Sequence, residues 1–115
     1  MPKIKSMTRE LTSKSFQKEV LNNEHPVIVQ FCNRWNGACQ IFSPIYEELD
    51  RAYEGRVSFY NVDIEKESVL EKEYRIVEVP TILIFDRGYL IDYSKGLIPR
   101  NNLIEKIENA LQQSK

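Results

Sequence analysis

Apolar residues recur along the chain with two different periods, which predict alternating helices and strands. Phe16, Val20 and Leu21 recur with helical spacing within Ser13–Asn23. A residue that precedes a proline disfavours the helical backbone, so the helix should end before Pro26. The first regular element is therefore expected to be a short helix with one apolar face.

Four segments have the pattern of strands. Val27–Cys32 is almost entirely apolar and rich in β-branched residues, which is typical of a central strand buried on both faces. Val57–Val62 predicts a second strand. Thr81–Phe85 and Tyr89–Tyr93 predict two more, joined by a tight turn at Asp86-Arg87-Gly88, where the glycine allows a left-handed backbone.

Two further helices and a short one complete the pattern. Asn36–Tyr53 predicts a long helix that Pro44 should kink. Ser68–Tyr74 predicts a short polar helix with Ser68 as its N-cap, and Arg100–Gln113 predicts a final amphipathic helix. The apolar stripe of the long helix consists of Ile41, Phe42, Ile45, Tyr46, Leu49 and Tyr53. This order of elements predicts an α/β fold, in which a mixed sheet has helices on both faces.

The composition is that of one ordinary globular domain. The chain has 115 residues, 42% hydrophobic and 29% charged, so we expect a single domain over residues 1–115. A net charge of −1 argues against a nucleic-acid partner, and no segment reaches the roughly 18 apolar residues of a membrane span. Residues 1–10 lack the apolar segment of a secretory signal. We therefore expect a cytoplasmic chain, unless an export signal has been removed.

The two cysteines lie near one predicted strand–helix junction. Cys32 ends the strand and Cys39 lies in the first turn of the helix. Two cysteines and one histidine are too few for a disulfide framework or a metal cluster, and no motif for a cofactor stands out. A helix N-terminus stabilises a thiolate, and redox proteins place a Cys-x-x-Cys pair there. These two thiols are therefore the candidates for chemistry.

The segment Trp35-Asn36-Gly37-Ala38-Cys39 resembles the thioredoxin-family signature Trp-Cys-Gly-Pro-Cys with two substitutions. The similarity extends from about Leu11 to Leu111. It implies the thioredoxin fold, a cis peptide bond before Pro80 and a relationship to thiol–disulfide oxidoreductases. Other positions that match the family are Pro44, Val62-Asp63, Val79-Pro80-Thr81, Gly88 and Gly96.

The departures from the family pattern affect its chemistry. Asn36 replaces the attacking cysteine, and a carboxamide cannot form the mixed disulfide through which exchange proceeds. Gln30 replaces a buried aspartate that assists proton transfer, and Tyr60 is matched to the lysine that pairs with it. Ala38 replaces a proline that tunes the redox potential. Ordinary dithiol reductase activity is therefore expected to be absent or very weak.

Asn36 and Cys39 each have a structural and a functional interpretation. Asn36 is expected to cap the helix by accepting from the N–H of Cys39; the alternative is that it donates hydrogen bonds to a docked ligand. Cys39 is either a small buried hydrophobe, the favoured reading, or a single acidic thiol. A third hypothesis is a relocated redox pair, in which Cys32 and Cys39 bond if their Cα atoms lie within about 7 Å.

Two functions follow from the resemblance. The first is a residual thiol redox role through Cys39, alone or with Cys32. The second is a non-catalytic binding module with a protein or peptide partner on the active-site face; glutathione is a further candidate partner. Lys95, beside this face, is interpreted as a solvated lysine, with a preference for acidic partners as the alternative. The residues that match the family's docking surface are Trp35, Gly37, Ala38, Val79, Pro80 and Gly96.

Overall fold

The strands form one mixed five-stranded sheet in the order β1-β3-β2-β4-β5. The computed structural model describes residues 8–114; most of the segment on which the expectation about an export signal rests lies outside them. β2 runs parallel to β3 and antiparallel to β4, and β1 runs parallel to β3. The strands are β1 (Arg9–Glu10), β2 (Val27–Cys32), β3 (Ser58–Asp63), β4 (Thr81–Asp86) and β5 (Tyr89–Lys95).

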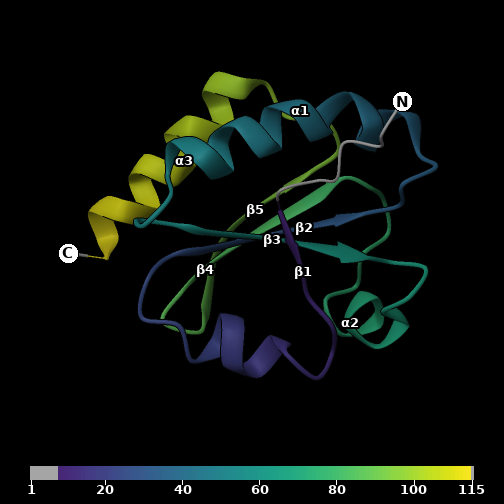
Figure 1. The fold of residues 1–115 in the computed structure, drawn as a ribbon, viewed down its shortest axis with the longest axis horizontal. Helices are drawn as coiled ribbons and strands as arrows, with labels where there is room; N and C mark the ends of the chain where they lie inside the picture. Colours follow the sequence, from purple (N-terminus) through teal and green to yellow (C-terminus); the bar gives the residue numbers. More distant parts are fainter. Residues whose placement is uncertain (1–7, 115) are drawn as a thin grey trace.

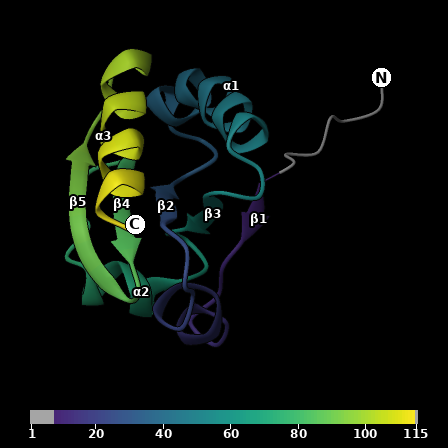
Figure 2. The ribbon, with the colours of Figure 1, turned by 90° about the vertical axis from the view of Figure 1, so that its left-hand side faces the viewer.

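Helices cover both faces of the sheet, as the sequence predicted (Figure 1). Two long helices, α1 (Gly37–Ala52) and α3 (Arg100–Gln113), lie on one face. A π-helical turn, η1 (Gln17–Leu21), and the short α2 (Ser68–Glu73) lie on the other. Figure 2 shows these layers turned by 90°, with the strands side by side from β5 on the left to β1 on the right. The α/β fold and its mixed sheet are therefore confirmed.

β2 supplies side chains to both hydrophobic cores. Ile28 packs in the core under α1 and α3, whereas Val27, Val29 and Phe31 pack in the core over η1 and α2. All four are fully buried. Because successive strand residues point to opposite faces, a strand buried on both sides must be apolar at almost every position, as the sequence of β2 is. This double burial fixes the position of the strand's last residue, Cys32.

Tyr46 fastens α1 to the sheet. Its hydroxyl lies 3.2 Å from the carbonyl oxygen of Ile28 and 2.6 Å from that of Tyr60. Burial raises the pKa of Tyr46 well above its usual value, so the phenol keeps its proton and remains a donor. The helix that carries Cys39 is therefore attached to both β2 and β3 by a buried polar contact as well as by its apolar side chains.

Several local expectations were wrong. The first helix is only η1, and Leu21 is 37% exposed because the chain turns out of the helix there. Ile41 is 66% exposed, so it lies outside the apolar stripe of α1.

Ser68 does not cap α2. The cap position is Glu67, whose carboxylate accepts from the backbone N–H of Ser13 at 2.8 Å. β1 was not predicted at all, because two residues give no periodic pattern.

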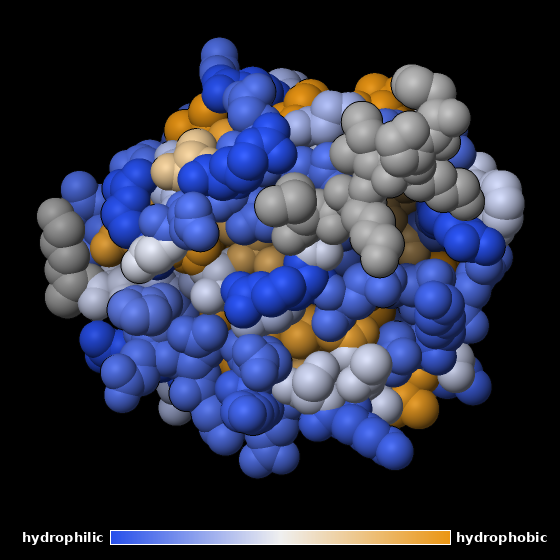
Figure 3. Space-filling model, viewed as in Figure 1, coloured by the Kyte–Doolittle hydropathy of each residue, from blue (hydrophilic) through white to orange (hydrophobic). Residues whose placement is uncertain are grey.

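The surface carries mostly polar groups on the side shown in Figure 3, with apolar side chains visible between them. Among the described residues, no helix is both long enough and apolar enough to cross a membrane.

The β4–β5 turn depends on a glycine. β4 extends one residue further than predicted, to Asp86, so only Arg87 and Gly88 connect it to β5. Both of these residues have a positive φ. A Cβ on Gly88 would lie 2.6 Å from the carbonyl oxygen of Leu21, closer than a carbon and an oxygen can approach. Gly55 also has a positive φ, +86°, but no described residue has an atom within 4 Å of the position that its Cβ would take.

We therefore expect Gly88→Ala to lower the free energy of unfolding by about 3 kcal/mol, combining backbone strain with a steric clash. Gly55→Ala, the matched control, should lower it by about 1 kcal/mol, from backbone strain alone. Urea denaturation of both variants measures the difference. Equal losses in the two variants would show that the contact with Leu21 is unimportant.

Candidate functional site: a disulfide at the strand–helix junction

The two cysteines are joined. Cys32 is the last residue of β2 and Cys39 lies in the first turn of α1. Their Cα atoms are 5.9 Å apart and their sulfurs form a disulfide bond. The separation lies within the geometric limit for a relocated pair. Cys39 is buried, as expected for a small hydrophobic residue, but it is bonded to Cys32 and is not a free thiol in this structure.

The two sulfurs of the pair have different environments. Cys39 is 3% exposed, as expected for the more internal residue, whereas Cys32 is partly exposed. Cys32 is therefore the more accessible residue of the pair.

Asn36 is the N-cap of α1. Its Oδ1 accepts from the backbone N–H of Cys39 at 3.1 Å, and its backbone is extended, as at other N-caps. The carbonyl of Asn36 also accepts from the N–H of Gln40 at 3.0 Å. The cap interpretation is thus confirmed. Since the same hydrogen bond holds the backbone of Cys39, Asn36 also positions the buried half of the disulfide.

Gln30, whose amide side chain does not titrate, lies in β2 two residues before Cys32. The side chain is 2% exposed, and its Nε2 donates to Oδ1 of Asn61 at 2.9 Å. Its Oε1 is buried and has no hydrogen-bond partner among the residues that the structure describes. Most buried acceptors are satisfied, so this oxygen is an exception that needs an explanation.

Tyr60 is not the partner of Gln30. It pairs with Val29 in the sheet, whereas Asn61 pairs with Gln30, so Tyr60 points to the opposite face. Its hydroxyl donates to a carboxylate oxygen of Glu19 at 2.8 Å. Burial, and then this hydrogen bond, raise the pKa of Tyr60 to about 12, which keeps it neutral. Tyr60 therefore does not lie beside Gln30, where the matched lysine was expected, because neighbouring residues of a strand point to opposite faces.

A cavity of about 350 Å³ opens beside the disulfide. Both cysteines contribute to its wall, together with residues from the ends of β2 and β3 and from the first turns of α1. The complete lining is Glu10, Gln30, Cys32, Arg34, Cys39, Gln40, Ser43, Asn61, Val62, Asp63 and Lys66. The sequence did not predict this cavity, because its residues come from four separate segments.

The six residues matched to the family's docking surface lie outside that cavity. The indole of Trp35 is 68% exposed, with the guanidinium of Arg34 4.7 Å from the ring centre. The Val79–Pro80 peptide bond is cis, and the carbonyl of Pro80 accepts from the N–H of Gly96 at 2.7 Å. In α1, Gly37 is exposed and Ala38 is partly exposed. The structure thus joins Pro80 and Gly96 directly, while their role in docking stays a prediction.

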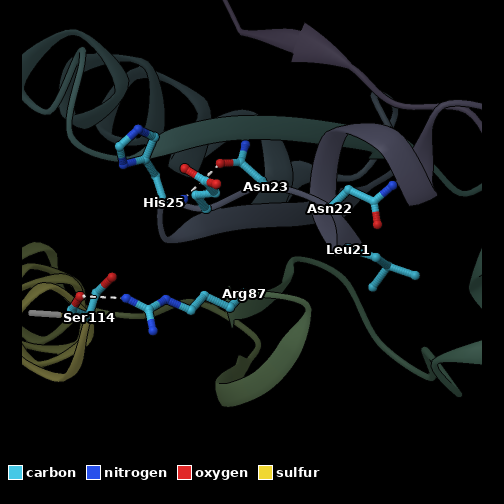
Figure 4. A pocket seen from close by; sticks show the side chains of 7 residues that line it. Leu21, Asn22, Asn23, His25, Arg87 and Ser114 are labelled. Atoms are coloured by element: carbon cyan, nitrogen blue, oxygen red, sulfur yellow. Dashed lines mark hydrogen bonds between the residues drawn. The ribbon is translucent and has the colours of Figure 1, made fainter.

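A second, larger cavity lies at the other end of β2 (Figure 4). It has a volume of about 670 Å³ and is lined in part by His25, Arg87 and Ser114; the Arg87 guanidinium donates to the carbonyl of Ser114 at 3.3 Å. No cysteine lines it. Within residues 8–114, no group of three or more His, Cys, Asp or Glu side chains could hold a metal ion.

Comparisons with known proteins agree with this architecture. The family model described as Thioredoxin matches residues 7–109. The chain is 35% identical to a thioredoxin of Rickettsia bellii over 103 residues, covering 90% of this chain and 98% of the relative. It is 30% identical to thioredoxin 1 of a Nostoc species over 106 residues, covering 92% and 99%. It is also 36% identical to the chloroplastic thioredoxin Y2 of Arabidopsis thaliana over 104 residues, spanning 90% of this chain and 62% of that protein.

The cap gives a direct test of the role of Asn36. Asn36→Ala removes the acceptor for the N–H of Cys39, so we expect the free energy of unfolding to fall by about 1 kcal/mol. Asn36→Asp keeps an acceptor oxygen, so its free energy of unfolding should fall by a few tenths of a kcal/mol at most. Urea denaturation of the oxidised proteins measures both. An Asn36→Ala variant as stable as the parent would contradict the cap.

Proposed function

Because the chain belongs to the thioredoxin family, we propose that it carries out thiol–disulfide exchange through Cys32 and Cys39. The observation that carries the proposal is the disulfide between a partly exposed cysteine and a buried one. This is the asymmetry that exchange needs, because one sulfur must meet the substrate and the other must resolve the intermediate. The pair is displaced from the usual spacing: Cys32 supplies the accessible thiol that position 36 lacks.

In the reductive direction, the Cys32 thiolate attacks one sulfur of a substrate disulfide. A mixed disulfide forms, and the other substrate sulfur leaves as a thiolate. The Cys39 thiolate then attacks the Cys32 sulfur, which re-forms the internal disulfide and releases the second substrate thiol. Cys39 suits this second step, because the first turn of α1 presents N–H groups and a partial positive charge that stabilise its thiolate.

Turnover of the ordinary family type is expected to be weak. Asn36 cannot form a mixed disulfide, and its carbonyl oxygen is engaged as a cap. Gln30 cannot transfer a proton as a buried aspartate does. The substitutions at these two positions support a specialised exchange protein, with a narrower choice of partner than a general reductase.

A second candidate is a binding module without thiol chemistry. The observation in its favour is the exposure of Trp35, since an exposed aromatic beside other apolar groups often marks a contact surface. In this reading a protein or peptide binds over Trp35, Val79 and Pro80, and Gly37, Ala38 and Gly96 allow its backbone to approach. The disulfide would then only stabilise the junction.

Single-cysteine variants separate these functions. In Cys39→Ser the remaining Cys32 is accessible, and in Cys32→Ser the remaining Cys39 is buried. With glutathione disulfide we expect the Cys32 thiol to form a mixed disulfide about tenfold faster than the Cys39 thiol, because access controls the rate. Intact mass spectrometry follows the adduct, and the unfolded variants serve as the control for intrinsic reactivity.

Faster reaction of Cys39 would reverse the proposed roles of the two thiols. Two thiols that both stay unmodified in the folded variants, yet react when unfolded, would overturn the exchange function and favour the binding module.

A further inference from the structure

We propose that the cavity beside the disulfide is the entry site for the reducing thiol, and that it takes a small thiol bearing carboxylate groups. The proposal deepens the exchange function and rests on it. It assigns thiol entry to the side of α1 that faces β3, away from the surface around Trp35 and Pro80.

The position of the cavity supports this route. Cys32 and Cys39 both form part of its wall, whereas Trp35, Val79 and Pro80 do not. Its volume of about 350 Å³ suits a molecule the size of a short peptide rather than a folded protein. A thiol that occupies the cavity therefore lies beside the more accessible sulfur.

The charges in the lining indicate the class of thiol. Lys66 supplies an exposed cation, and Glu10 and Asp63 supply two carboxylates, while the guanidinium of Arg34, another lining residue, lies over the ring of Trp35. Of the residues that the structure describes, none forms a salt bridge with Arg34 or Lys66. A thiol with both carboxylate and ammonium groups, such as glutathione, complements this mixture. An uncharged thiol would gain nothing from it.

The inner wall of the cavity contains a hydrogen-bond acceptor for the Cys39 thiol that reduction would produce. When the disulfide opens, Cys39 gains a buried S–H group that needs a partner. The Oε1 of Gln30 is buried in the same wall and has no hydrogen-bond partner within residues 8–114, so we assign it this acceptor role. A neutral amide here also avoids the repulsion that a buried carboxylate would exert on the departing Cys39 thiolate.

The thiol reduces the Cys32–Cys39 disulfide in two successive exchanges. The incoming thiol loses its proton to solvent, and its thiolate attacks the sulfur of Cys32. A bond forms between these sulfurs while the Cys32–Cys39 bond breaks, and the electron pair goes to the sulfur of Cys39, which takes a proton from solvent. A second molecule of the thiol attacks the mixed disulfide, releases the oxidised thiol dimer and leaves Cys32 reduced.

Two lysines on different sides of the site provide the test. Lys66 lines the cavity, and Lys95 lies next to Gly96, beside the surface around Trp35 and Pro80. Both are exposed, so Lys66→Glu and Lys95→Glu make the same charge change without disturbing the core. The measurement is the rate at which glutathione reduces the disulfide of each oxidised variant, with 2-mercaptoethanol as the uncharged control thiol.

We expect Lys66→Glu to slow reduction by glutathione about fivefold at low salt, with the difference shrinking as salt screens the charge. Its reduction by 2-mercaptoethanol should be unchanged, and Lys95→Glu should react like the parent with both thiols. A slower Lys95→Glu beside an unaffected Lys66→Glu would place entry on the other surface and overturn the inference alone. A parent disulfide that neither thiol reduces in the folded protein would instead overturn the proposed exchange function.

Discussion

The burial of β2 on both faces is the constraint on which the site depends. A strand that supplies side chains to two cores cannot slide by one residue, because the shift would exchange its side chains between the two cores and disrupt the packing of both. Its last residue, Cys32, is therefore held at a fixed point at the end of the strand. The buried contact of Tyr46 with the backbone of β2 and β3 fixes α1, and with it Cys39, relative to that point. The disulfide joins two elements that the fold has already aligned.

The unusual residues at the junction are consistent with one another. The side chain of Asn36 is not a nucleophile. It caps α1 instead, which stabilises the turn that carries Cys39. Cys32 brings a second sulfur within bonding distance of that turn. Gln30 replaces an acid with a neutral amide in the wall between them. They fit the proposed exchange site, in which Cys32 on the strand supplies the accessible thiol and a small thiol enters beside β3.

Much of the fold could be predicted from the sequence, and the site only in part. The long helices and the central strands have strong periodic patterns, so their positions were correct to within one or two residues. β1 was missed because it is too short for a pattern, and Ser68 failed as a cap because Glu67 and Ser13 meet only in the folded chain. The approach of Cys32 to Cys39 could be proposed from their places at one junction. The cavity and the opposite orientation of Tyr60 could not, because they depend on strand register.

The central claim is that Cys32 and Cys39 form a reversible redox pair. The most direct measurement is the intact mass of the protein after equilibration across a series of glutathione redox poises, with rapid alkylation of free thiols. The account predicts a two-state change between a form with two alkylated thiols and a disulfide form that takes up no alkyl group, with a midpoint at a defined poise. Two alkylatable thiols under every condition, even the most oxidising, would contradict it.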